Sequence, residues 1–124
     1  MKNEEINGVL KADKAKQYEY FIKKIADYEE VWSLRDDEGW ATLGLDDGMF
    51  FPVWAKKEFA ELCTDEEWSG YRAESIDLDE FLEDWLEGLK EDGIRITVMW
   101  NNGLGIDVDW DKLRSDIETE LENY

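Results

Sequence analysis

The sequence predicts an α+β fold, in which helices cover an antiparallel or mixed sheet of about six strands. Short runs rich in β-branched and aromatic residues alternate with turn residues, as in strands that follow one another closely. Elsewhere, apolar residues recur every three or four positions, as in amphipathic helices. The 124 residues, 43% of them hydrophobic, suit one globular domain over 1–124 with a single core.

The chain is predicted to begin with a helix and to continue with a meander of three antiparallel strands. The helix runs from about Lys11 to Asp27, with an apolar stripe formed by Tyr18, Phe21, Ile22 and Ile25. The strands are the β-rich runs between turn residues, at 31–35, 40–45 and 49–54. Because Pro52 has no N–H to donate to a ladder, the third strand should be an edge strand or bulged there.

A short central helix is predicted over 56–64, and a further helical turn over 64–68, capped by Thr64 or Asp65. A strand around 71–76 follows. Cys63 should lie in the core, since unpaired cysteines usually behave as small hydrophobes. A single cysteine permits no intramolecular disulfide, which agrees with a reducing compartment.

The strongest helical signal begins at Asp77, which can cap a helix with Glu80 three residues later. Gly93 should end this helix. Its apolar side chains follow at helical spacing: Leu78, Phe81, Leu82, Trp85, Leu86 and Leu89.

The chain is predicted to end with a hairpin and a final amphipathic helix. Residues 94–101 and 104–108 flank Asn102 and Gly103, which supply the two positive φ angles of a type I′ turn. Asp109 can then cap a helix. The apolar stripe of that helix is Trp110, Leu113, Ile117 and Leu121.

Asp107, Asp109 and Asp111 are spaced like the first ligands of a calcium loop, with Glu118 at its twelfth position. However, Lys112 stands where such a loop needs glycine, and a helix is expected to begin at this point. We therefore predict no metal site and expect Asp107 to face solvent. Asp109 should cap the helix, and Asp111 should interact favourably with the positive end of the helix dipole.

The composition excludes several kinds of chemistry. The chain has no histidine, which removes the usual Ser-His-Asp and Cys-His nucleophilic systems, and one cysteine cannot form a structural zinc site. No phosphate-binding glycine motif is present. With 33 acidic residues, nearby carboxylates arise by chance, so no catalytic pair can be chosen by spacing. We predict no catalytic residue and no cofactor, and consider an enzyme less expected than a binding protein.

The negative charge is concentrated in residues 64–92, which include one predicted amphipathic helix. The net charge is −19, and residues 64–92 contain twelve acids and two bases. Such a charge disfavours nucleic acid and membrane surfaces as partners. One interpretation is a solvated face that maintains solubility; the other is a docking surface for a basic protein. The candidate partner-binding residues, opposite the apolar stripe, are Asp79, Glu80, Glu83, Asp84, Glu87 and Glu91.

Seven tryptophans are many for a chain of this length. Trp85 and Trp110 belong to helical apolar stripes and are expected in the core. Strand side chains alternate between faces, so the tryptophans in strands need not all be buried. Exposed ones beside acidic residues would suit a protein interface.

Several segments together resemble a bacterial family, the domain of unknown function 2750 (DUF2750). They lie at 20–34, 39–43, 52–63, 77–89 and 92–94, within a likeness that spans roughly residues 15 to 122. The resemblance implies a small bacterial cytoplasmic protein and brings no assigned activity or catalytic residue. More distantly, the order of a Pro-Val-Trp strand, a short helix, a strand and an Asp-x-x-x-Phe-Leu helix is similar to the amino-terminal domain of serine-sensitivity enhancer proteins.

Two functions of different classes follow from the sequence. The leading hypothesis is a non-catalytic module whose acidic surface binds a basic protein, as an inhibitor, an immunity-type protein or an adaptor. The alternative is a small-molecule or cation-binding domain, with or without catalysis, that uses carboxylates and tryptophans in a cleft. We expect a cytoplasmic monomer or weak homodimer, the latter joined through the edge strand near Pro52 or an apolar helix face.

Overall fold

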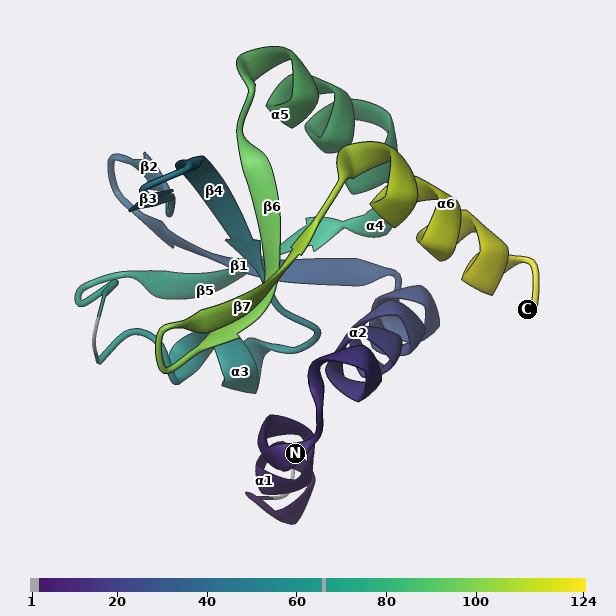
Figure 1. The fold of residues 1–124 in the computed structure, drawn as a ribbon, viewed down its shortest axis with the longest axis horizontal. Coiled ribbons are helices and arrows are strands. Elements are labelled where there is room, and N and C mark those ends of the chain that lie inside the picture. Colours follow the sequence, from purple (N-terminus) through teal and green to yellow (C-terminus); the bar gives the residue numbers. More distant parts are fainter. Residues whose placement is uncertain (1–2, 66) are drawn as a thin grey trace.

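The computed structural model describes residues 3–65 and 67–124 (Figure 1). Its helical segments are α1 (Asn3–Lys11), α2 (Lys14–Tyr28), α3 (Lys57–Glu61), α4 (Leu78–Glu80), the π-helical η1 (Phe81–Trp85), α5 (Leu86–Asp92) and α6 (Trp110–Leu121). Its strands are β1 (Glu30–Asp36), β2 (Gly39–Trp40), β3 (Leu43–Leu45), β4 (Gly48–Val53), β5 (Arg72–Asp77), β6 (Arg95–Asn101) and β7 (Leu104–Val108). The predicted α+β class is therefore confirmed.

The strands form two sheets. One is antiparallel, with the order β2-β1-β5, and the other is mixed, with the order β3-β4-β6-β7 and a parallel β4–β6 pair. The sheets meet at Trp32 and Trp54, whose backbones exchange hydrogen bonds of 3.1 and 2.8 Å. The sequence predicts about six strands in one sheet, whereas the described residues form seven strands in two linked sheets.

The antiparallel pairings of the predicted three-stranded meander are confirmed, but its middle strand is not continuous. The run at 40–45 is divided between the sheets, because β2 pairs with β1 and β3 pairs with β4. Ala41, between them, is fully buried, and its N–H donates to the carbonyl of Leu34 at 2.9 Å. The main partner of β1 is β5, in a register from Glu30 opposite Asp77 to Arg35 opposite Arg72.

The expectation that the strand is an edge strand or bulged at Pro52 is wrong, because β4 lies between β3 and β6 and its register with β6 runs unbroken through Pro52. Pro52 is tolerated there because β3 has already ended, its pairing stopping at Leu43 opposite Phe50. The carbonyl of Pro52 accepts a 2.7 Å hydrogen bond from the Ser33 hydroxyl. Pro52 itself is buried.

The helical starts and stops differ from the predictions at three places. The N-terminal helix begins at Lys14 rather than Lys11, because Asp13 caps it by accepting from the Lys16 N–H at 2.9 Å, and α1 precedes it as a separate helix. The expected turn of helix after Thr64 is not formed among the described residues, and its Glu66 lies outside them. The central helix, predicted over 56–64, is confined to α3 at Lys57–Glu61, and the Thr64 hydroxyl donates to the Glu61 carbonyl at 2.8 Å just after it.

Other local predictions are confirmed. Asp77 accepts from the Glu80 N–H at 3.3 Å, and Gly93 ends the helix with a φ of 71°. Asn102 and Gly103 have φ angles of 50° and 81°, as a type I′ turn requires. Asp109 caps α6 through two backbone N–H groups.

The core lies between the sheets and the helices, and α5 and α6 lie side by side at one end of β6 and β7 (Figure 1). Cys63 is buried, as predicted, and so are Trp54, Trp68 and Trp100. Trp85 and Trp110, expected in the core, are only partly buried and pack against its margin. No helix in the described part of the chain combines the length and apolarity needed to cross a bilayer.

Candidate functional site

The predicted acidic face exists as an exposed surface of one continuous helix. Segments α4, η1 and α5 follow each other without a break from the Asp77 cap to Gly93. The apolar stripe is turned inward, with Phe81 and Leu86 almost wholly buried. All six predicted carboxylates point to solvent: Asp79, Glu80, Glu83, Asp84, Glu87 and Glu91. We call these six residues the acidic face.

No side chain of the acidic face forms a hydrogen bond or ion pair within residues 3–65 and 67–124. The base on the same helix, Lys90, is directed away from it, and its ammonium lies 3.1 Å from the Asp111 carboxylate on α6. The charges of the acidic face are therefore uncompensated within this part of the protein. A cationic partner would meet carboxylates whose hydrogen-bonding capacity is unused.

Beneath the acidic face, the helix rests on an aromatic cluster. The ring of Trp85 stacks on Phe51 with a centroid separation of 5.3 Å and meets Trp40 edge-on at 5.0 Å. Trp85 closes η1, the π-helical segment. Such segments within α-helices are frequent at functional sites. These contacts with Phe51 and Trp40 hold the ring of Trp85 in place beside the acidic face.

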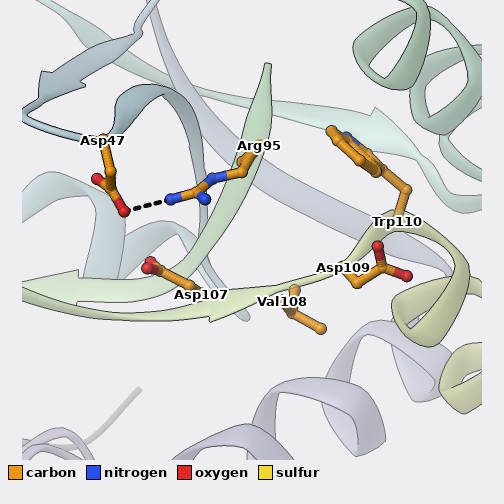
Figure 2. Close-up of a pocket in the computed structure, with 6 residues that line it drawn as sticks. All are labelled: Asp47, Arg95, Asp107, Val108, Asp109 and Trp110. Atoms are coloured by element: carbon orange, nitrogen blue, oxygen red, sulfur yellow. Dashed lines mark hydrogen bonds and ion pairs between the residues drawn. The ribbon is translucent and has the colours of Figure 1, made fainter. Parts of the chain in front are cut away.

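A pocket of about 350 Å³ lies at the end of the mixed sheet (Figure 2). Arg95, at the start of β6, reaches across it and binds Asp47 of the β3–β4 turn, with 2.6 Å between Nη2 and Oδ2. The guanidinium also covers the ring of Phe50, 4.5 Å from its centroid. The hydrogen bond from Arg95 lowers the pKa of the Asp47 carboxyl below its usual value.

The opposite wall of this pocket comes from the end of β7 and the start of α6 (Figure 2). Trp110 is anchored there, because its indole N–H donates to the Ile94 carbonyl at 2.8 Å. Asp109 already accepts from the N–H groups of Asp111 and Lys112, at 3.0 and 3.2 Å. Asp107 is exposed and makes no such bond among the described residues. The pocket thus offers one unengaged carboxylate, one ion pair and an aromatic wall.

The three aspartates with calcium-like spacing do not converge on one point. Asp107 extends from a strand, Asp109 caps a helix, and Asp111 pairs with Lys90. Within the described residues, no three carboxylate or cysteine side chains are arranged to hold a metal ion. The three aspartates stand at every second position where the chain changes from strand β7 to helix α6, so their side chains diverge.

Asp47 and Arg95 are not among the residues that the sequence singles out. They are 48 positions apart and meet because β4 and β6 pair in parallel, with Phe50 opposite Arg95. Nothing local in the sequence indicates this long-range pairing. Gly88 is a local signal that the sequence does contain, because glycine in the interior of a helix usually has a packing or functional reason.

Comparison with curated proteins gave no match. A family model described as "Protein of unknown function (DUF2750)" matches residues 18–117. The match begins within α2 and ends within α6, so it includes both sheets and the helix that carries the acidic face. It is slightly shorter than the likeness over 15 to 122 expected from the sequence. Because the match covers most of the chain, this protein belongs to the DUF2750 family.

Proposed function

We propose that this protein is a non-catalytic interaction module that binds a basic protein through the acidic face. The observation that carries the proposal is the exposure of six carboxylates with no internal partner among the described residues. The partner could be inhibited, neutralised as in immunity-type pairs, or brought to a third protein; these are forms of the same contact.

The acidic face has an electrostatic cost that the fold does not recover. Like charges one turn apart on a helix destabilise it by about 0.2–0.5 kcal/mol per pair. Glu80 and Asp84, Glu83 and Glu87, and Glu87 and Glu91 are such pairs. A basic partner would turn this repulsion into attraction and would also be steered by the net charge of −19.

We place this function in the bacterial cytoplasm. The support is the family resemblance and the presence of one cysteine in the sequence, which permits no intramolecular disulfide. A chain without an internal disulfide agrees with a reducing compartment.

Two charge variants with equal net charge test the proposal. The first neutralises the acidic face by Asp79→Asn, Glu80→Gln, Glu83→Gln, Asp84→Asn, Glu87→Gln and Glu91→Gln. The matched control neutralises six exposed glutamates spread over the rest of the molecule: Glu4, Glu19, Glu38, Glu61, Glu118 and Glu122. The probe is a synthetic basic peptide, acetyl-Arg-Gly-Arg-Gly-Arg-amide, in about 0.01 M salt, where the Debye length is about 30 Å.

We expect the first variant to bind the peptide at least about tenfold more weakly than the control variant, as measured by calorimetry or fluorescence. Binding to the unmodified protein should disappear in about 1 M salt, where screening acts within about 3 Å. Equal weakening in both variants would show that only the overall charge matters and would refute the assignment to the acidic face.

A second candidate function is supported by the pocket of Asp47, Arg95, Asp107 and Trp110 (Figure 2). It is the carboxylate- and tryptophan-lined cleft that a small organic cation would occupy, with its apolar part on Trp110 and its charge near Asp107. Arginine methyl ester and spermidine are suitable probes. Saturable shifts of the Trp110 indole signal that Asp107→Asn abolishes would support this function, and uniform weak shifts over all acidic surfaces would refute it.

A further inference from the structure

A hollow of about 260 Å³ lies on the helix of the acidic face, beside Trp85. It is lined by Asp84, Trp85, Gly88, Leu89 and Asp92. Two carboxylates, a tryptophan and a residue without a side chain thus meet on one helix surface. We refer to this place as the Trp85 hollow.

Gly88 has no structural role that would explain it. It lies inside α5, where glycine is the least favourable residue apart from proline. A Cβ added at Gly88 would meet nothing within 4 Å, and its φ is not positive. Gly105, by contrast, has a packing reason to be glycine, because a Cβ there would lie 2.1 Å from the Thr97 hydroxyl. The effect of the glycine at Gly88 is to keep the hollow beside Trp85 open.

The indole N–H of Trp85 is also unused. Trp32, Trp54, Trp68, Trp100 and Trp110 all donate their indole N–H to acceptors in the protein. Among the described residues, Trp40 and Trp85 donate to none, and these two rings are in contact. Neither nitrogen belongs to the buried unpaired atoms, so both remain accessible. Trp85 therefore offers a binding partner both ring surface and a donor.

The helical positions place the carboxylates on either side of the open space. Asp84, Gly88 and Asp92 follow at four-residue steps and form one row, with Trp85 and Leu89 in the neighbouring row. Each carboxylate-bearing residue is about 6 Å from Gly88 along the axis. Asp92 stands at the carboxyl end of the helix, where the helix dipole disfavours an acid. A cation seated over Gly88 would be attracted to both carboxylates and to this end of the dipole.

From this geometry we propose that the Trp85 hollow receives an arginine side chain of the basic protein partner. A planar guanidinium stacks on an indole and donates to carboxylates at the same time, which a lysine ammonium does less well. Its aliphatic part would lie on Leu89. The inference rests on the proposed function, since it identifies the residue by which the partner is anchored on the acidic face.

The test uses the full chain and the peptide acetyl-Arg-Gly-Arg-Gly-Arg-amide. Gly88→Leu fills the hollow and leaves every charge in place. Gly8→Leu is its control, because Gly8 also lies in a helix with nothing within 4 Å of an added Cβ. We expect Gly88→Leu to weaken peptide binding about fivefold and Gly8→Leu to leave it unchanged. Among the tryptophan indole signals, that of Trp85 should shift on binding.

A second pair of variants keeps the proposal falsifiable if Gly88→Leu folds poorly. Asp92→Asn removes one carboxylate of the hollow, and Glu118→Gln removes a charge from an exposed position on α6. Asp92→Asn should weaken binding more than Glu118→Gln does. The lysine version of the peptide should bind more weakly than the arginine version, and equal affinity would overturn the guanidinium assignment.

The possible failures are distinguishable. If the charge-neutralised acidic face loses binding while Gly88→Leu and Asp92→Asn bind like the unmodified protein, the hollow is wrong and the proposed function stands. If the charge-neutralised face also binds like its control, the proposed function fails as well.

Discussion

At the scale of single residues, the closest packing constraint is at Gly105 on β7. A Cβ there would lie 2.1 Å from the Thr97 hydroxyl and 2.9 Å from Cε3 of Trp100. Both neighbours are buried, so neither can move aside without disturbing the core. Glycine at this position is required by the approach of β6 to β7, not by a positive φ.

We therefore expect Gly105→Ala to lower the free energy of unfolding by about 1–3 kcal/mol, through overpacking. Urea denaturation followed by tryptophan fluorescence measures this change. Gly44→Ala is the control, since its Cβ would meet only the flexible end of Met49, at 3.3 Å. A Gly105→Ala protein as stable as the control would show that β6 and β7 are less closely packed.

Tyr18 makes the stability depend on pH in the alkaline range. Burial raises the pKa of its phenol well above the usual value, assisted by the hydrogen bond to Asp116 at 2.6 Å. A raised pKa means that the folded state favours the neutral phenol. The stabilisation is complete below the unfolded pKa of about 10 and is lost as the pH rises above it.

Tyr18→Phe should thus reduce the loss of stability between about pH 9 and pH 11. The measurement is the urea midpoint at each pH. Tyr71→Phe is the same chemical change at a phenol with no hydrogen bond among the described residues. If both variants lose stability as steeply as the unmodified protein, the Tyr18 phenol does not contribute.

At the scale of elements, the helix from Asp77 to Gly93 has well-formed ends and an unfavourable surface. Its Asp77 cap and Gly93 termination follow ordinary helix rules. Its exposed surface does not, because acids recur at four-residue steps and continue to the carboxyl end. The buried stripe therefore has to stabilise a helix that its outer face disfavours.

Glu91→Lys should stabilise the protein by about 1 kcal/mol. The new lysine would follow Glu87 by four residues, in the favourable order, and would complement the helix dipole. Thermal unfolding in low salt measures the effect, which should shrink in about 1 M salt. Unchanged or lower stability in low salt would mean that the acidic face is not repulsive within the helix.

At the scale of the whole molecule, the excess charge acts on folding as well as on binding. The described residues form four ion pairs, all at least partly exposed, and these offset little of the net charge of −19. A compact state with this charge repels itself. Added salt should relieve the repulsion.

We expect the thermal midpoint to rise by on the order of 4 °C between about 0.01 M and 1 M sodium chloride, which corresponds to roughly 1 kcal/mol. Differential scanning calorimetry at several salt concentrations measures it. A falling midpoint would show that the ion pairs stabilise the protein more than the net charge destabilises it.

The sequence by itself determined the local features of this protein. The Asp77 and Asp109 caps, the Gly93 stop and the Asn102-Gly103 turn each depend on residues within a few positions of one another. The positions of the acidic face could be predicted for the same reason, since helical periodicity separates exposed from buried residues.

Only the tertiary structure decided which strands pair and which side chains meet. The run at 40–45 contains no local signal that it divides between two sheets, and the pairing of β1 with β5 joins segments about forty residues apart. Asp47 meets Arg95 through such a pairing, and Trp85 meets Trp40 and Phe51 because its helix packs against the strands that carry them. The choice among strand partners depends on how all the apolar faces are buried together, which no single segment encodes.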